Sequence, residues 1–247
     1  MLTMQRLRMM RNSTSSRVNR RRFLSAVALA PVAVALRTAP SYADARYGPV
    51  TSEPYPVPAV PNGTVAPAYL RQSVAYRTKH PAGTIVIDPA ERFLYLVQGG
   101  GRALRYGVAV GKAGFAWSGS ARIGRKAQWP RWTPPAAMID RQPELVRYSA
   151  AYGGFPPGPD NPLGARALYL YRGGRDTLYR IHGTNEPWSI GQNMSSGCIR
   201  LLNQDAIDLY NRVAVGAKVV VLGNAQPTPQ RSVRRSPTRD AHHRGLY

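Results

Sequence analysis

Apolar and polar positions alternate in short runs through the middle of the chain, as is typical of β-strands. Residues 84–88 (TIVID) and 92–97 (RFLYLV) are rich in β-branched and aromatic side chains, and residues 89–91 (PAE) separate them. Short runs of this kind, bounded by turn residues, predict two strands joined in a hairpin. Residues 105–110 predict a further strand that ends at Gly111.

The second half of the chain carries three more strand patterns. Residues 167–171, 178–182 and 218–222 are short apolar-rich runs that predict strands, and the last of these is expected to be buried. Residues 112–165 are instead rich in Gly, Pro and Trp, so we expect long loops with short strands in this region.

One helical pattern stands among these strands. Asn203 is its predicted N-cap, Asp205 lies favourably near the positive N-terminal end, and Gly216 marks its stop. The apolar residues that fall on one face of this helix are Ala206, Ile207, Tyr210, Val213 and Ala214. Together these patterns predict a mainly β domain with one principal helix.

Composition divides the rest of the chain into segments around that domain. Residues 46–82 open with a Pro-rich stretch and predict an extended spacer of polyproline character. Residues 83–223 contain the predicted strands and helix. Residues 224–247 hold five Arg and few large apolar side chains, so we expect a disordered basic tail.

Residues 1–45 have the layout of an export signal. Three arginines at residues 20–22 precede a 13-residue apolar run at residues 24–36, and cleavage sites follow after Ala43 or Ala45. The apolar run is too short to span a membrane, which takes about 20 residues. The arginines resemble a twin-arginine signal, and an Arg-rich Sec signal is the alternative. We therefore expect a periplasmic protein with no transmembrane anchor after processing.

The charge of the chain is strongly positive. The 34 Lys and Arg against 12 Asp and Glu give a net charge of +22, of which residues 1–45 carry +7 and residues 224–247 carry +4. Such a charge favours an anionic partner, either a nucleic acid or an acidic polymer or membrane surface. Export away from the cytoplasm disfavours nucleic acid as the partner. The single cysteine excludes an intramolecular disulfide and a CxxC metal site.

Cys198 and His182 are the candidate catalytic residues. Cys198 follows Gly197, which lets the backbone approach a substrate, and it stands in a polar, cationic setting that favours a reactive thiolate. His182 ends a predicted strand and is the only histidine of the predicted folded domain. A Cys–His pair is the minimal arrangement for acyl transfer, in which His accepts the thiol proton and later donates it to the leaving amine.

Each of the two residues also has a structural alternative. A lone cysteine is often a small buried apolar residue, and a histidine at the end of a strand is often structural. The surrounding sequence distinguishes these alternatives. Residues 182–185 (HGTN) and 195–201 (SSGCIRL) resemble the signature of the L,D-transpeptidases, the YkuD-type catalytic domain in its ErfK/YbiS-like branch. Residues 129–135 (WPRWTPP) and 161–164 (NPLG), together with Asp205, are also similar to that branch.

The resemblance implies a β-sandwich-like domain built on a mixed sheet, and it assigns roles to residues. Cys198 would attack the carbonyl at the L-centre of a diaminopimelate residue in a peptidoglycan stem peptide and expel the terminal D-alanine. His182 would be the general base and acid, and the backbone carbonyl of Gly183 would orient it. The backbone N–H groups of Gly197 and Cys198 would form the oxyanion hole.

Other residues near the cysteine are expected to contact the substrate. Many members of the family have His where this chain has Ser196, so His182 would act without a second histidine. Ser195, Ser196 and Arg200 are the predicted substrate-binding residues, with a structural salt bridge as the alternative for Arg200. Three tryptophans would either line the substrate groove or serve packing alone, and they are Trp129, Trp132 and Trp188.

The resemblance also implies partners. The acyl acceptor would be a second diaminopimelate side chain, an outer-membrane protein or water, and no metal or organic cofactor is required by thioester chemistry. Two other functions remain open from the sequence. One is a secreted cysteine peptidase or carboxypeptidase, and the other is a catalytically inactive module that binds the cell wall.

Overall fold

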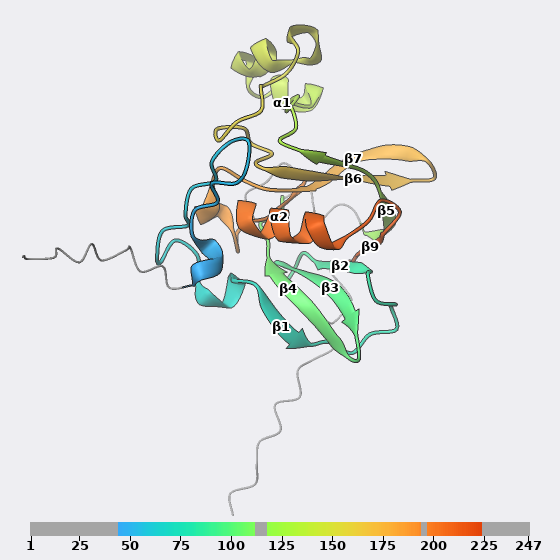
Figure 1. Cartoon of the computed structure of the whole chain (residues 1–247). Coiled ribbons are helices and arrows are strands. Elements are labelled where there is room, and N and C mark those ends of the chain that lie inside the picture. The colour runs from blue at the N-terminus through green and yellow to red at the C-terminus, as the bar shows by residue number, and fades with distance from the viewer. Residues whose placement is uncertain (1–43, 112–117, 194–196, 224–247) are drawn as a thin grey trace, which may run out of the picture. The chain divides into compact units, whose positions relative to one another are not determined.

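The computed structural model describes residues 44–111, 118–193 and 197–223 (Figure 1). Most of the expected export signal, Ser195 and Ser196, and the expected tail lie outside the described residues. The strands are β1 (Gln72–Ala75), β2 (Ile85–Asp88), β3 (Phe93–Gly99), β4 (Arg102–Gly107), β5 (Gly119–Gln128), β6 (Arg166–Arg172), β7 (Arg175–His182), β8 (Ile199–Arg200) and β9 (Lys218–Val221). The α-helices are α1 (Ala136–Ile139) and α2 (Asn203–Arg212), and the 3-10 helices are η1 (Ala45–Tyr47), η2 (Pro67–Tyr69), η4 (Pro143–Tyr148), η5 (Ala150–Tyr152) and η6 (Pro187–Ser189).

The strands of the described chain form one mixed sheet in the order β1-β4-β3-β2-β9-β5-β6-β7-β8. The pairs β2–β9 and β7–β8 are parallel, and the other pairs are antiparallel. β9 comes from the end of the domain and lies between β2 and β5, so it joins β1–β4 to β5–β8. The predicted mainly β class with a mixed sheet is therefore confirmed.

The main hydrophobic core lies between these two halves of the sheet and α2. It combines Ile85 and Leu94 from β2 and β3 with Leu170 and Ile181 from β6 and β7, and with Leu209 from α2. Figure 1 shows α2 running between the strands β6–β7 and the strands β2–β4. Because both halves bury one face against the same helix, the sheet has the sandwich-like arrangement that the resemblance implies.

The sequence predicted most strands and missed one of the longest. β2 and β3 pair as the expected antiparallel hairpin, with Ile87 opposite Leu94. β5 spans ten residues in a region where we expected mainly loops. Its buried Ala121 and Ile123 alternate with exposed Arg and Gly, so the apolar signal is weak, and pairing with both β6 and β9 stabilises the strand.

The structure corrects the extended spacer predicted for residues 46–82. Tyr47, Val57 and Val65 are buried between the prolines, and β1 pairs with β4 as part of the sheet. The Tyr47 hydroxyl donates to the buried carboxylate of Asp205 on α2 at 3.2 Å. Prolines exclude regular hydrogen bonding but not burial of the apolar residues between them, so the segment packs onto the domain.

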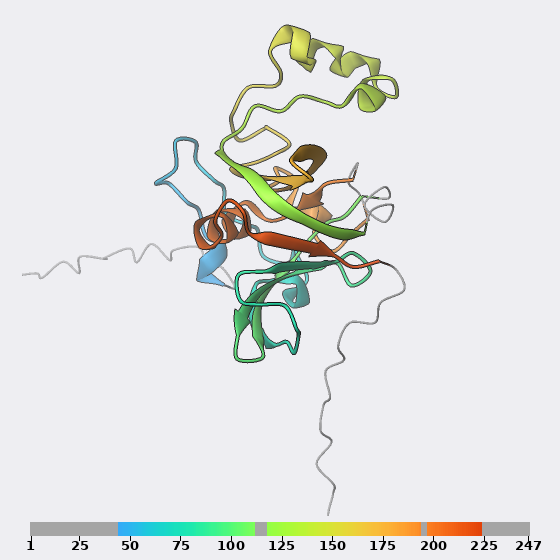
Figure 2. The same cartoon turned by 90° about the vertical axis from the view of Figure 1, so that its right-hand side faces the viewer.

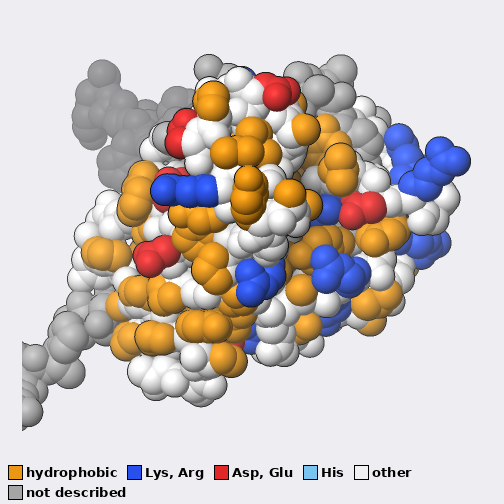
Figure 3. All heavy atoms as spheres, turned by 90° about the horizontal axis from the view of Figure 1, so that it is seen from above, with side chains coloured by type: hydrophobic (Ala, Val, Ile, Leu, Met, Phe, Trp, Pro, Cys, Tyr) orange, Lys and Arg blue, Asp and Glu red, His pale blue; other side chains and the backbone are white. Residues whose placement is uncertain are grey.

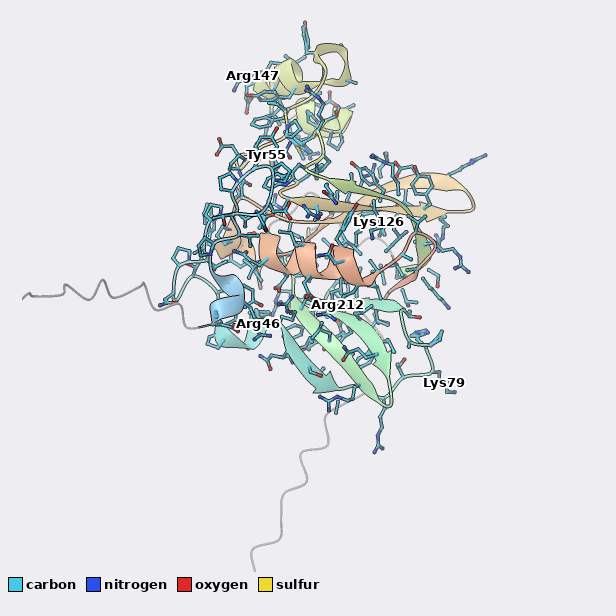
Figure 4. The ribbon with its side chains drawn as sticks, viewed as in Figure 1. Arg46, Tyr55, Lys79, Lys126, Arg147 and Arg212 are labelled. Carbon is cyan, nitrogen blue, oxygen red and sulfur yellow. The ribbon has the colours of Figure 1, made fainter. Side chains whose placement is uncertain are left out.

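The principal helix is where the sequence places it, but Asn203 is not its N-cap. Leu202 occupies the cap position, and Asn203 is the first residue of α2. The helix ends at Arg212, so the predicted face residues Val213 and Ala214 lie beyond it. Lys126 on β5 donates from Nζ to the carbonyls of Tyr210 and Val213 at this end, where a cation is favourable (Figure 4).

Short helices fill the long connection between β5 and β6. α1, η4 and η5 form a group beside the sheet (Figure 2), and the connection returns at a bridge between Trp132 and Phe155. Two features are absent from the described part of the chain. None of its helices has the length and apolar character needed to cross a membrane, and no group of three His, Cys, Asp or Glu side chains could hold a metal ion.

Candidate active site

His182 is the last residue of β7, and its imidazole is buried. Nδ1 of the ring lies 2.6 Å from the carbonyl oxygen of Gly183. Since a carbonyl oxygen can only accept a hydrogen bond, Nδ1 carries the hydrogen and Nε2 of the neutral ring presents a lone pair. This is the contact that the resemblance implies for Gly183, and it leaves the imidazole in the tautomer that a general base requires.

Asn203 braces the turn that carries Gly183. Its Nδ2 donates to the carbonyl of Thr184 at 2.9 Å, and its Oδ1 accepts from the backbone N–H of Ala165 at 2.9 Å. A Cβ atom added at Gly183 would lie 2.1 Å from Oδ1 of Asn203, so only glycine fits this position. The first residue of α2 therefore holds the backbone that orients His182.

Cys198 directly precedes β8, which pairs in parallel with the end of β7 through Ile181 and Ile199. Gly197 before it has a φ angle of 124°, which side chains other than glycine rarely adopt. The Cys198 sulfur accepts a hydrogen bond from the backbone N–H of Arg180 and lies 3.9 Å from the carbonyl oxygen of Leu178. The thiol thus meets the backbone edge of β7.

The register of β7 and β8 brings the predicted nucleophile and base together. Ile181 and Ile199 both point into the main core, so Arg180, His182 and Arg200 leave their strands on the opposite face. Cys198 contacts β7 at Arg180, two residues before His182, and two residues along a strand span about 7 Å. Side chains 16 positions apart in sequence therefore share one end of β7.

Burial keeps both groups neutral. It raises the pKa of the Cys198 thiol above its ordinary value, against the opposing effects of the Arg180 backbone N–H and the positive charges of Arg180 and Arg200. Burial also lowers the pKa of His182 to about 4, and the charges of Arg200 and Arg180 act in the same direction against the Gly183 carbonyl. At neutral pH the site therefore holds a thiol and a neutral imidazole.

Of the three predicted substrate-binding residues, only Arg200 is described. Its Nη1 lies 2.6 Å from Oε2 of Glu186, in the loop that follows the HGTN residues. This ion pair is the structural alternative considered for Arg200, and it joins β8 to that loop. Ser195 and Ser196 lie outside the described residues, so their role stays a prediction.

The tryptophans have different environments. Trp129 is buried against Tyr55, and its indole N–H donates to Glu53 at 2.9 Å, so this residue packs against the N-terminal segment. Trp132 is half-buried at its bridge to Phe155. Trp188 is 54% exposed in η6. Packing alone therefore explains Trp129, while Trp188 has the accessibility that a substrate contact requires.

Sequence reasoning missed the residues of β7 that surround the sulfur. Leu178 has a φ angle of 63° in a bulge of β7 and is 72% exposed beside Cys198. Asp176 holds this bulge by accepting from the N–H of Leu178 at 2.9 Å and by pairing with Arg180 at 2.7 Å. The available signal was that Arg180 stands two residues before His182 in a predicted strand, and therefore on the same face.

Comparisons with known proteins indicate the family of this chain. A family model described as the L,D-transpeptidase catalytic domain, YkuD, matches residues 82–221. The probable L,D-transpeptidase YbiS of Escherichia coli K12 is 38% identical over 144 residues, which cover 55% of this chain and 43% of that protein. The probable L,D-transpeptidase ErfK/SrfK of the same organism is 34% identical over 142 residues, which cover 56% of this chain and 43% of that protein.

A solved structure from Brucella melitensis also matches, under a title that names a probable carnitine operon oxidoreductase. It is 49% identical and covers 64% of this chain and 97% of that chain, with a TM-score of 0.45. The matches to the two curated relatives span less than half of their length. Because the family model covers more than half of the sequence, including both His182 and Cys198, the chain belongs to the L,D-transpeptidase family of the YkuD type.

Proposed function

We propose that this chain is a peptidoglycan L,D-transpeptidase in which Cys198 is the nucleophile and His182 is the general base. Family membership supports the reaction class, and one contact carries the assignment of roles. Because Nδ1 of His182 donates to Gly183, the Nε2 lone pair is available to accept a proton at the end of β7 where Cys198 lies. This arrangement fits the acid–base chemistry of acyl transfer.

In the proposed first step, the sulfur of Cys198 attacks the carbonyl carbon at the L-centre of a diaminopimelate residue. The thiol proton passes to Nε2 of His182. The same proton then goes to the nitrogen of the terminal D-alanine, whose C–N bond breaks. A thioester remains on Cys198. An amine acceptor attacks the thioester carbon and passes a proton to Nε2 of His182. The C–S bond then breaks, and His182 returns that proton to the departing sulfur, which regenerates the thiol.

The neutral state of the site supports a coupled proton transfer. A thiol with a raised pKa is a poor nucleophile until its proton moves, and the nearby neutral imidazole can accept that proton. The backbone N–H groups of Gly197 and Cys198 are the proposed oxyanion donors. The positive φ of Gly197 supports this role because it turns the backbone sharply just before the nucleophile.

The substrate contacts and the acceptor complete the proposal. Ser195 and Ser196 would contact the stem peptide, and Arg200, held by Glu186, would position the loop around it. The acceptor would be a second diaminopimelate amine, giving a 3→3 cross-link, or an outer-membrane protein. Both acceptors require export to the periplasm, which we propose proceeds by the twin-arginine route.

Mass spectrometry of muropeptides after incubation with the purified mature protein tests this function. Cross-linked products would support transpeptidation, while loss of D-alanine alone would indicate a carboxypeptidase. Wall binding without any product, together with no covalent labelling of Cys198 by a carbapenem, would indicate an inactive binding module. The matched control is Cys198→Ala, which removes the nucleophile and should lose both the products and the label.

A further inference from the structure

A bulge interrupts β7 shortly before His182. Residues 177–179 of β7 lie against the single residue Leu170 of β6, so the strand carries additional residues at this point. Leu178 is the middle residue of the bulge, and its φ angle is 63°. This backbone conformation is strained for a bulky side chain, and strain of this kind is concentrated at functional sites.

Hydrogen bonds from neighbouring side chains hold the bulge in this conformation. The Leu178 N–H donates to Oδ1 of Asp176 at 2.9 Å, and the Thr177 hydroxyl donates to the Leu170 carbonyl at 2.7 Å. The Asp176 carboxylate also pairs with Arg180 through two contacts, at 2.7 and 2.8 Å. Because these bonds fix the backbone on both sides of Leu178, the strain is a defined feature of β7.

The Leu178 side chain is 72% exposed although it is apolar. Figure 3 shows hydrophobic side chains spread over one face of the molecule among Lys and Arg side chains, so exposure by itself does not identify a binding residue. At Leu178 the exposure is combined with a strained backbone. Glycine adopts a positive φ without strain, so neither packing in the core nor backbone geometry explains a leucine at this position.

Leu178 borders the proposed nucleophile. Its carbonyl oxygen lies 3.9 Å from the Cys198 sulfur. Its Cβ is three bonds from that oxygen, so the side chain begins within about 7 Å of the sulfur. Among the described strands, β8 pairs with β7 only at Ile181 and His182. The bulge therefore lies just beyond the paired part of this edge, where Cys198 meets β7.

The proposed substrate has an apolar group at a matching distance. A carbonyl carbon ready for attack lies about 3–3.5 Å from the attacking atom. In diaminopimelate the next carbon bears a chain of three methylene groups, which extends about 4 Å further. These methylenes can therefore contact a side chain that begins within about 7 Å of the sulfur. They also offer more apolar surface for burial than the single methyl group of the terminal D-alanine.

We propose that Leu178 is a substrate-binding residue whose side chain contacts the methylene groups of the acylated diaminopimelate. This inference rests on the proposed function and deepens it, because it names a residue that selects the acyl donor by its aliphatic side chain. The strained backbone is then the cost of holding an apolar side chain in solvent beside Cys198. Removing the side chain should weaken binding of the stem peptide while the reactive pair stays in place.

Calorimetric titration of a stem tetrapeptide into Cys198→Ala tests this contact without turnover. Adding Leu178→Gly should raise Kd roughly tenfold, because the apolar contact is lost. Adding Leu178→Met restores apolar surface and should keep Kd within about twofold of the Cys198→Ala value. The matched control is Val215→Gly, which removes an exposed apolar side chain from the turn before β9 and should leave Kd unchanged.

Three results of this titration would overturn the proposal. They are unchanged binding after Leu178→Gly, equal weakening by Leu178→Met or Val215→Gly, and no detectable binding of the tetrapeptide to Cys198→Ala.

Changes in the peptide identify the group that Leu178 contacts. A peptide with alanine in place of diaminopimelate has no methylene chain, so Leu178→Gly should not weaken its binding. A peptide with glycine in place of the terminal D-alanine should keep the roughly tenfold effect. An effect that persists with the alanine peptide would overturn the proposal. A wild type that binds the tetrapeptide through Leu178 but neither releases D-alanine nor forms cross-links would instead refute the proposed function.

Thermal unfolding separates the contact from a folding defect. Glycine favours the positive φ of this position, so the unfolding midpoint of Leu178→Gly should equal or exceed that of the wild type. A variant that is as stable yet binds less well cannot owe its loss to unfolding. If Leu178→Gly unfolds at a lower temperature, Leu178→Asn is the second variant, because asparagine also adopts a positive φ. Wild-type binding by Leu178→Asn would overturn the proposal, since its side chain is polar.

Discussion

The two ends of β7 belong to one strand of eight residues and have opposite physical characters. At its end, His182 is buried and its pKa is lowered to about 4, beside a thiol whose pKa is raised. At its start, Arg175 is exposed and faces a second arginine across the hairpin. The two proposed reactive groups at the buried end are neutral at pH 7, and the exposed end carries two facing arginines.

The buried end suits the chemistry that we propose for it. Acyl transfer depends on groups that exchange protons at short range, and removal of water strengthens their interactions. The turn that Asn203 braces lies at this buried end, directly after His182.

Removing the reactive pair should have the largest effect, and it acts only on the buried end. Cys198→Ala should abolish acyl transfer and carbapenem labelling, and His182→Ala should slow acylation by about 10²–10⁴. The double variant should be no worse than Cys198→Ala, because the residues act as a unit. Intact-protein mass spectrometry measures the rate, and a near wild-type rate for His182→Ala at pH 7 would refute the base role.

The dependence of the acylation rate on pH below neutrality tests the lowered pKa of the buried His182. A base with a pKa of about 4 stays neutral at pH 5, so acylation should be nearly as fast at pH 5 as at pH 7. A histidine at the ordinary value of about 6.5 would be about 30-fold less available at pH 5. Single-turnover acylation from pH 3.5 to 7 distinguishes the two, and a midpoint near 6.5 would show that burial does not set this pKa.

Removing the Asn203 side chain, which braces the turn after His182, should have an intermediate effect on the acylation rate. Asn203→Ala leaves the Thr184 carbonyl and the Ala165 N–H without their partner, so it should cost about 1–3 kcal/mol in the free energy of unfolding. Acylation should fall by roughly 10- to 100-fold as Gly183 shifts. The control is Gln204→Ala, whose side chain bonds the N-terminal segment and not this turn. Equal slowing in both variants would mean that general destabilisation, not positioning, is responsible.

Replacing the buried Asp205 on α2 should change the pH dependence of the free energy of unfolding, with a smaller effect than the variants above. Burial raises the pKa of Asp205 to about 7, despite the nearby Arg71 and the Tyr47 hydroxyl. Its contribution to stability is therefore full below about pH 4 and is lost as the pH rises through about 7. Asp205→Asn removes this loss, so its stability relative to the wild type should increase from pH 5 to pH 8.

Urea unfolding at the two pH values measures the difference between Asp205→Asn and the wild type. His182 contributes in the opposite sense, because its lowered pKa means that stability is lost as the pH falls from about 6.5 to about 4. That contribution is present in both proteins and cancels. A relative stability that falls between pH 5 and pH 8 would contradict a raised pKa for Asp205.

The smallest effect is expected at Ser196, which stands two residues before Cys198 in the sequence and is assigned no proton transfer. Ser196→Ala should acylate within a few-fold of the wild-type rate, because the proposed oxyanion donors are the backbone groups of Gly197 and Cys198. The acylation assay used for Cys198→Ala measures this. Inactivity as complete as that of Cys198→Ala would assign the Ser196 hydroxyl a catalytic part.

Local sequence signals predicted the strands around the site and the pair of reactive residues. The runs at residues 84–88 and 92–97 match β2 and β3, and the HGTN and SSGCIRL motifs carry the family assignment. The same signals failed for β5 and for residues 46–82. β5 gains its stability from two neighbouring strands, and the second segment buries isolated apolar residues that have no periodicity.

The identities and spacing of His182, Gly183, Gly197 and Cys198 are properties of the sequence, and they indicate the family and the residues that we propose to react. Tertiary structure decided the state of those residues. The parallel pairing of β7 and β8 placed the thiol against the backbone of Arg180, and Asn203 braced the turn whose Gly183 carbonyl orients the imidazole. The pKa values and the cross-strand charge pairs depend on desolvation and register, which arise from segments far apart along the chain.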